Sequence, residues 1–164
     1  MNAEGKGEID DVLTALLWAY KNNVDIINIS FGFSTNYSEL QEMIDLLVSE
    51  GIIIVAASGN NLGREVDYPA RYHNVISVGS IDKDGNIDIL SAQGKIDIFA
   101  PGKDILTTSM SGGYETVRGT SYSTAFITGA LVNGLSSNDI NTNFDDDIFK
   151  QSLKYLKKVD LIKD

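Results

Sequence analysis

The chain has 164 residues, a length typical of one domain and sufficient to bury a hydrophobic core. Its formal charge of −10, from 13 Lys and Arg against 23 Asp and Glu, would repel a phosphate backbone, so we expect no nucleic-acid partner. The lack of cysteine excludes disulfides, cysteine-ligated metals and a thiol nucleophile. Apolar runs are far shorter than the about 20 residues of a membrane span, and residues 1–7 do not resemble a signal peptide. We therefore predict no membrane span, and the compartment stays unknown.

The first half of the chain alternates between helix and strand patterns. Apolar residues at three- and four-residue spacing predict two amphipathic helices, over residues 8–22 and 38–50. Ser38 and Gln41 have capping-box spacing at the start of the second helix. Apolar, β-branched runs predict buried strands at residues 25–30, 52–57 and 75–79. This alternation indicates right-handed crossovers, so we predict an α/β fold: a parallel sheet with helices on both faces.

The pattern changes in the second half. Residues 82–86 predict a turn, although they also resemble part of a calcium loop that lacks its later glutamate. Short strands are expected at residues 96–100 and 114–118, and helices at 121–135 and 144–161. In the first of these helices, the residues expected on the buried side are Ala125, Phe126, Thr128, Gly129 and Leu131. No repeat or Pro-rich linker divides the chain, so residues 1–164 are treated as one unit.

Five segments carry the functional signal. In chain order they are Asn28-Ile29-Ser30-Phe31-Gly32, Val55-Ala56-Ala57-Ser58-Gly59-Asn60, Tyr68-Pro69-Ala70-Arg71-Tyr72, Phe99-Ala100-Pro101-Gly102 and Gly119-Thr120-Ser121-Tyr122-Ser123. Together they resemble segments of the subtilisin-like serine peptidases (subtilases), in the family's order and at similar spacings, over about residues 3–135. The resemblance implies a three-layer subtilisin-like fold and a serine endopeptidase that hydrolyses peptide bonds through an acyl-enzyme.

The resemblance assigns two catalytic residues. Ser121 would be the nucleophile at the start of a buried helix, where free N–H groups and the helix dipole favour negative charge on a bound carbonyl oxygen. Asn60 would supply a second oxyanion donor through its side-chain amide. Taken alone, Ser121 is also compatible with a plain helix N-cap, and Asn60 with a turn residue beside Gly59.

The resemblance also assigns a substrate site. The backbone of Ser30, Phe31 and Gly32 would pair with an extended substrate peptide as an added strand. The pocket for the residue before the cut bond would be formed by Ala57, Ser58 and Gly59 as one wall, with Ala70 near its base and Asp67 toward its floor. A carboxylate at Asp67 predicts a preference for a basic side chain, with a solvated loop charge as the alternative.

The chain departs from the family pattern in two ways. Thr124 and Ala125 stand where the family usually has a Ser-Pro pair, which leaves the pocket shape open. The family's catalytic aspartate and histidine lie on segments before the first helix predicted in this chain, and the chain's one histidine, His73, falls where the family has no catalytic group.

These departures lead to an expectation about the chain as a whole. We expect the C-terminal part of a catalytic domain, with a sheet incomplete on its N-terminal side and almost no activity alone. Such a chain should self-associate or bind an N-terminal segment that completes the domain. The alternative is a non-catalytic peptide-binding or assembly module on the same scaffold.

The resemblance implies no required cofactor. It does allow a structural calcium or monovalent cation, held by the backbone oxygens of Ala70, Tyr72 and Val75 with Asp97 nearby.

Overall fold

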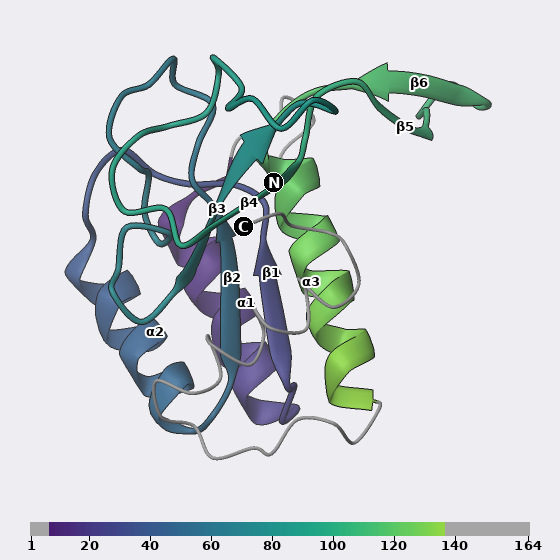
Figure 1. The fold of residues 1–164 in the computed structure, drawn as a ribbon. Helices are drawn as coiled ribbons and strands as arrows, with labels where there is room; N and C mark the ends of the chain where they lie inside the picture. Colours follow the sequence, from purple (N-terminus) through teal and green to yellow (C-terminus); the bar gives the residue numbers. More distant parts are fainter. Residues whose placement is uncertain (1–6, 137–164) are drawn as a thin grey trace.

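The computed structural model describes residues 7–136. Three helices are present in this range: α1 (Ile9–Lys21), α2 (Ser38–Ser49) and α3 (Thr120–Ser136). The strands are β1 (Ile26–Ile29), β2 (Ile53–Ala57), β3 (Ile76–Ile81), β4 (Ile98–Pro101), β5 (Ile105–Thr108) and β6 (Tyr114–Val117). The first four strands form a parallel sheet in the order β1-β2-β3-β4, and β5 and β6 form a separate antiparallel hairpin that extends from the body of the molecule (Figure 1).

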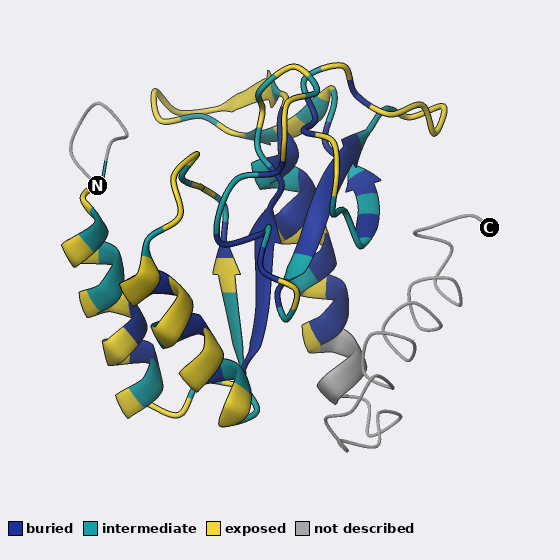
Figure 2. Ribbon diagram, turned by 90° about the vertical axis from the view of Figure 1, so that its left-hand side faces the viewer, coloured by how far each residue is buried: buried dark blue, intermediate teal, exposed yellow. Residues whose placement is uncertain are grey.

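The sheet is the middle of three layers, with α1 and α2 on one face and α3 on the other (Figure 2). The sequence of the inner strand β2 is continuously apolar because the strand is covered on both faces. Ile54 packs into the core cluster shared with α1 and α2, whereas Ile53 and Val55 pack into the cluster shared with α3. A strand covered on both faces has no solvent-facing position, so all five β2 residues are buried. The predicted α/β fold is confirmed.

The sheet brings separate loops to one edge. Because β1 and β2 are parallel, with Ile29 opposite Ala56, the segments that follow them leave from the same side of the sheet. The amino-terminal end of α3 lies at this edge, since Ser121 contacts Ser30, the residue that follows β1. Open α/β sheets form binding sites outside the carboxyl ends of their parallel strands, where the segments that follow neighbouring strands diverge.

Two details of the helices differ from expectation. The residue that precedes α2 is Tyr37, and Ser38 is already helical, with its hydroxyl bonded to Glu39 at 3.1 Å, so the predicted capping box does not form. In α3 the buried side is Ser123, Thr124, Ile127, Ala130 and Leu131. Of the residues predicted there, Leu131 is buried, Thr128 is half-buried, and Ala125, Phe126 and Gly129 are exposed. The helix is rotated because its small polar residues pack closely against the sheet.

The hairpin strand β5 was not predicted. Its residues alternate between half-buried and exposed, and Leu106 has 70% of its surface exposed, so no core contact explains its apolar character. The turn predicted at residues 82–86 is present, closed by the Gly85 N–H on the Asp82 carbonyl at 3.0 Å. The predicted helix over residues 144–161 lies outside the described residues. Within residues 7–136, no helix combines the length and hydrophobicity required to span a bilayer.

Candidate active site

Ser121 and Ser30 are joined by two reciprocal hydrogen bonds. The Ser121 hydroxyl donates to the Ser30 carbonyl at 2.7 Å, and the Ser30 hydroxyl donates to the Ser121 carbonyl at 3.1 Å. The Asn28 side-chain amide donates to the Ser30 hydroxyl at 2.8 Å, and its oxygen accepts from Thr128 at 2.8 Å. The first turn of α3 is thereby fixed to the end of β1, with Ser121 half-buried as the second residue of the helix.

Asn60 lies against the start of the same helix. Its side-chain oxygen accepts the Thr120 N–H at 2.9 Å and the Thr120 hydroxyl at 3.2 Å. Gly119 has φ +146°, and a Cβ built on it would lie 3.0 Å from the Asn60 amide nitrogen. This backbone conformation and this close approach both require glycine. The Asn60 carboxamide is thus held by its oxygen one residue before Ser121, with its NH₂ group beside Gly119.

The segments expected to bind substrate lie side by side. Ser30, Phe31 and Gly32 follow β1, while Ala57 ends β2 and Ser58 and Gly59 follow it. Phe31 and Gly32 are exposed, Ser30 and Gly59 are half-buried, and Ala57 and Ser58 are buried. The exposed backbone after β1 therefore borders the Gly59 loop, as an extended peptide site would require.

Asp67 fills the space between these two glycine segments. A Cβ on Gly32 would lie 2.7 Å from the Asp67 Cβ, and a Cβ on Gly59 would lie 2.4 Å from an Asp67 carboxylate oxygen. The Asp67 N–H also donates to the Ser58 carbonyl at 2.9 Å. Ala70, three residues later, is fully buried. Neither glycine tolerates a side chain, because a side chain would displace the Asp67 carboxylate or the backbone that carries it.

The Asp67 carboxyl is half-buried, and its ionisation reflects that position. Burial raises the pKa of the Asp67 carboxyl above its ordinary value, while the nearby Arg71 charge and a hydrogen bond from Asn61 act in the opposite direction. Arg71 is itself paired with Glu65 at 2.7 Å and lies over the Tyr68 ring. Asp67 is thus a partly desolvated carboxylate, and a cation that approached it would offset part of the cost of its negative charge.

The oxygens expected to hold a cation surround a side chain that the sequence reasoning missed. The Lys95 ammonium donates to the Ala70 carbonyl at 3.3 Å, to the Val75 carbonyl and to an Asp97 carboxylate oxygen at 2.6 Å. The Tyr72 carbonyl accepts the Val75 N–H at 3.2 Å. The available signal was the position of Lys95 two residues before Asp97, which brings a long basic side chain to the same loop.

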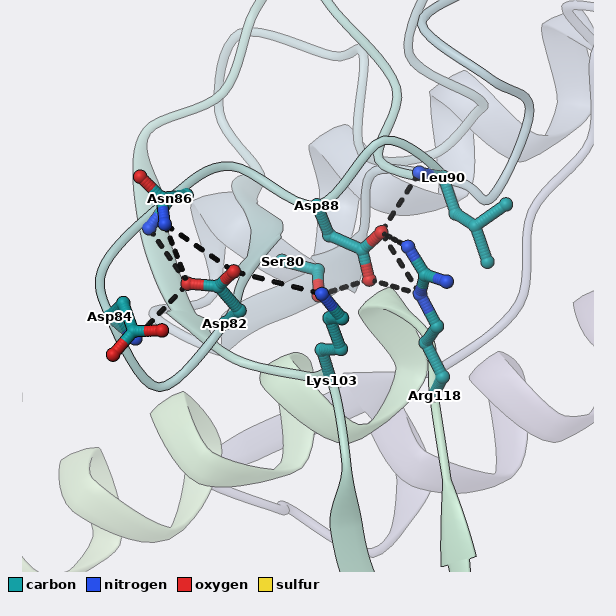
Figure 3. Close-up of polar contacts among 8 residues, drawn as sticks. All are labelled: Ser80, Asp82, Asp84, Asn86, Asp88, Leu90, Lys103 and Arg118. Atoms are coloured by element: carbon teal, nitrogen blue, oxygen red, sulfur yellow. Dashed lines mark hydrogen bonds and ion pairs between the residues drawn. The ribbon is translucent and has the colours of Figure 1, made fainter.

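A second polar cluster supports the segment that leads into α3 (Figure 3). The Arg118 Nε donates to the two oxygens of Asp88 at 3.0 and 2.8 Å, and Nη2 is paired with Oδ1 as well. The same carboxylate accepts the Leu90 N–H at 2.9 Å and the Ser80 hydroxyl at 3.4 Å. The hydrogen bonds from Arg118, outweighing the effect of burial, lower the pKa of the Asp88 carboxyl. Sequence reasoning missed this pair because its two members are far apart in the chain.

The acidic turn at residues 82–86 is closed by hydrogen bonds within the turn. The Asp82 carboxylate accepts N–H groups of Asp84 and Asn86, both at 3.0 Å, and Lys103 lies 3.7 Å away (Figure 3). Within residues 7–136, no group of three or more acidic, histidine or cysteine side chains could hold a metal ion. This geometry is that of a plain turn.

His73 is exposed, in the loop that precedes β3. Ser121 lies by the carboxyl end of β1, whereas His73 precedes the amino end of a parallel strand. The loop is bound instead near α2, where the Asn74 side chain donates to Asp45 at 2.7 Å. The one histidine of the chain is therefore not placed as a base for Ser121.

Comparison with known proteins gives consistent matches. The model of the subtilase family matches residues 1–154. Subtilisin BL and Subtilisin Savinase of Lederbergia lenta are each 34% identical over 131 residues, which cover 79% of this chain and 49% of each relative. Subtilisin E of Bacillus subtilis (strain 168) is 34% identical over 148 residues, covering 87% of this chain and 39% of the relative.

Solved structures agree. The prenylagaramide maturation protease PagA has a TM-score of 0.77 and 29% identity, covering 85% of this chain and 55% of that chain. The self-cleaved protease domain of PatA has a TM-score of 0.72 and 32% identity, covering 77% and 51%. The chain thus spans about half the length of these protease structures and of the Lederbergia relatives.

Proposed function

The chain belongs to the subtilase family of serine peptidases, and from this premise we propose that it carries the nucleophile, the oxyanion donors and the main specificity pocket of a serine endopeptidase. Ser121 Oγ attacks the peptide carbonyl carbon, and its proton passes to a histidine supplied from outside this chain. The histidine gives that proton to the leaving amine as the C–N bond breaks. Water then hydrolyses the resulting ester, which releases the new carboxyl end and restores Ser121.

The observation that carries the proposal is the position of Asn60 at the start of α3. A carboxamide held through its oxygen by Thr120 keeps its NH₂ group beside Gly119, on the side of the helix terminus where an oxyanion would bind. The Ser121 N–H belongs to the first turn of α3, where N–H groups have no partner within the helix. These two donors would stabilise the negative charge that develops on the attacked carbonyl oxygen.

We expect the chain alone to have almost no peptidase activity. The Ser121 hydroxyl donates to the Ser30 carbonyl, which is not a base, and His73 lies elsewhere. Without a base, the oxyanion donors and binding leave only about 10³–10⁴-fold acceleration over the uncatalysed reaction, a small part of an intact triad's effect. A histidine that accepted the Ser121 proton would have to displace the hydrogen bond to Ser30.

The histidine would arrive on a segment that joins the sheet at β1. Within residues 7–136 this strand is at one end of the sheet order, and Thr128 of α3 is hydrogen-bonded to its exposed residue Asn28. The outer edge of a parallel sheet has backbone groups that an added strand can pair with. We expect an N-terminal segment that carries the histidine to occupy this edge and, in its absence, a second copy of the chain to cover it. A clean monomer in size-exclusion chromatography at micromolar concentration would contradict the self-association.

The proposed substrate is an extended peptide with a basic residue before the cut bond. Its backbone would lie along Ser30, Phe31 and Gly32, and its basic side chain would reach the Asp67 carboxylate between Gly32 and Gly59. Asp67 is half-buried, and desolvation raises its pKa, so a cation brought against it is favoured more than at an exposed carboxylate.

The test uses a fluorophosphonate probe and intact-mass detection. The chain is treated alone and after mixing with an N-terminal subtilase segment that carries the family's aspartate and histidine. Attack by Ser121 Oγ forms an O–P bond and expels fluoride, which leaves a permanent mass increase. The proposal predicts labelling of the mixture and almost none of the chain alone.

Two variants locate the label. Ser121→Ala should abolish it, and Ser123→Ala should retain it, because Ser123 is buried within α3. If neither the chain nor the mixture is labelled, and the mixture still binds peptides, the non-catalytic binding module is the correct function.

A further inference from the structure

The Lys95 ammonium lies where a small cation would otherwise be expected. An ammonium has three N–H donors, and three oxygens accept from it: the carbonyls of Ala70 and Val75 and one carboxylate oxygen of Asp97. Two peptide carbonyls and a carboxylate are ligands of the kind that a hard cation selects. The donor set therefore suits a cation, and the chain provides one of its own.

These contacts tie together parts of the chain that are distant in sequence. Ala70 and Val75 belong to the loop before β3, whereas Lys95 and Asp97 lead into β4. The Asp97 carboxylate oxygen that accepts from Lys95 also accepts the Ser77 N–H at 2.8 Å. The ammonium thus fixes the loop to the sheet, close to the segment that carries Asp67 and Ala70.

A metal ion does not fit beside this side chain. Calcium takes six to eight oxygens at about 2.3–2.6 Å, and those of Ala70, Val75 and Asp97 already surround the Lys95 nitrogen. The ion pair is only partly exposed, with 28% of the Lys95 and 26% of the Asp97 side chain accessible. A second positive charge at the same point would meet direct repulsion with little screening by water.

We propose that Lys95 is a covalently attached replacement for a structural cation, which makes the loop from Ala70 to Val75 independent of calcium and of monovalent ions. It follows that the replacement is reversible by mutation. Removing the ammonium and adding a carboxylate at the same position should open a calcium site formed by the two carbonyls, Asp97 and the new side chain.

The experiment compares the full chain with its Lys95→Glu variant. Calcium binding is measured by isothermal titration, and the thermal midpoint is measured in EDTA and in millimolar calcium. The variant should bind one more calcium ion per chain than the wild type, and calcium should raise its midpoint by about 4 °C or more. The wild-type midpoint should be the same in EDTA and calcium, and the same in sodium and choline chloride.

A matched control separates a new site from general attraction of cations. Lys21→Glu makes the same change in net charge at an exposed position in the last turn of α1 and should bind no additional calcium. Equal calcium binding by the wild type and Lys95→Glu, or a loss of wild-type stability in EDTA, would overturn the proposal. The wild-type comparison decides even if the variant does not fold. No peptidase activity enters either measurement, so the result is independent of the proposed function.

Discussion

The Arg118 guanidinium donates hydrogen bonds from Nε and Nη2 to the Asp88 carboxylate, and the Asp88 side chain is fully buried. Arg118 is the residue before Gly119, so this ion pair fixes the chain at the point where it turns into α3. The carboxylate belongs to the connection between β3 and β4 and also accepts from Leu90. The position of the Ser121 segment thus depends on a charged pair outside the site itself.

Replacing Arg118 by leucine should destabilise the fold. The change leaves the buried Asp88 carboxylate without its cation, which for a fully buried pair costs about 3–5 kcal/mol. Because 36% of the Arg118 side chain is exposed, water can reach the vacated position, so the free energy of unfolding in urea should fall by less than for a fully buried pair. Arg64→Leu, at an exposed arginine, should change stability by no more than about 0.5 kcal/mol. Equal effects of the two variants would contradict the role of the pair.

The same pair predicts acid sensitivity. The pKa of Asp88 is lower in the folded chain than in the unfolded chain, mainly because of the hydrogen bonds from Arg118. Its stabilisation is therefore complete above the unfolded value of about 3.9 and is lost as the pH falls through the lower folded value. Wild-type stability should decline over this range more steeply than that of Asp88→Asn. Unfolding by urea at successive pH values from 5 to 2 measures both slopes, and parallel curves would refute the assignment.

Apart from β5, the order of helices and strands was predictable because it rests on local periodicity and on continuous apolar runs such as that of β2. The rotation of α3 was not, because its buried side contains Ser123 and Thr124, whose small size rather than hydrophobicity allows close packing on the sheet. The start of α2 at Ser38 was predicted correctly, but the capping box was not, because Ser38 is the first helical residue and Tyr37 is the residue that precedes the helix.

In the site, too, residues within local motifs were predictable, whereas residues whose partners are distant in sequence were not. Ser121, Asn60 and Asp67 were singled out through motifs that lie within short segments. Lys95 and Arg118 act on oxygens that are distant in sequence, and neither belongs to a recognisable motif. A lone basic residue on an acidic chain resembles a solvated surface charge until its partners are placed in space.

Gly119→Ala should impair the site more than the fold. Alanine at φ +146° is strained, and its Cβ would lie 3.0 Å from the Asn60 amide nitrogen, so the carboxamide must move. We expect about 10²-fold slower probe labelling of Ser121 in the mixed sample, comparable with the loss of one oxyanion donor. Gly112→Ala is a suitable control because it also has a positive φ but has no heavy atom within 4 Å of the added Cβ. Similar labelling rates for the two variants would contradict the placement of Asn60.

Asn60→Ala tests the same donor directly. Removal of the carboxamide should slow labelling by about 10²–10³-fold, the magnitude known for loss of this kind of donor in a subtilisin, a relative of this chain. Asn61→Ala, at the next residue, keeps Asn60 and should remain within about threefold of the wild type. An Asn60→Ala rate near that of the wild type would remove the amide from the proposed mechanism.

Asp67→Asn should change both substrate preference and pH dependence. The variant keeps the shape of the pocket floor but removes its charge. In the mixed sample, it should therefore cleave peptides with lysine or arginine before the cut bond more slowly than the wild type does. We expect the preference for these residues over leucine to fall by about 10-fold or more, since one charge-assisted hydrogen bond contributes about 1.5–3 kcal/mol.

The same variant tests the pH dependence of stability. The pKa of Asp67 is raised in the folded chain by burial, so its contribution to stability is complete below the unfolded value of about 3.9 and is lost as the pH rises through the folded value. Asp67→Asn should therefore be at least as stable as the wild type at pH 7, as measured by urea unfolding.

The control for substrate preference is Glu65→Gln. It removes an exposed carboxylate paired with Arg71 and should leave the preference for basic residues unchanged. If Asp67→Asn retained that preference, the basic side chain would have to be recognised elsewhere.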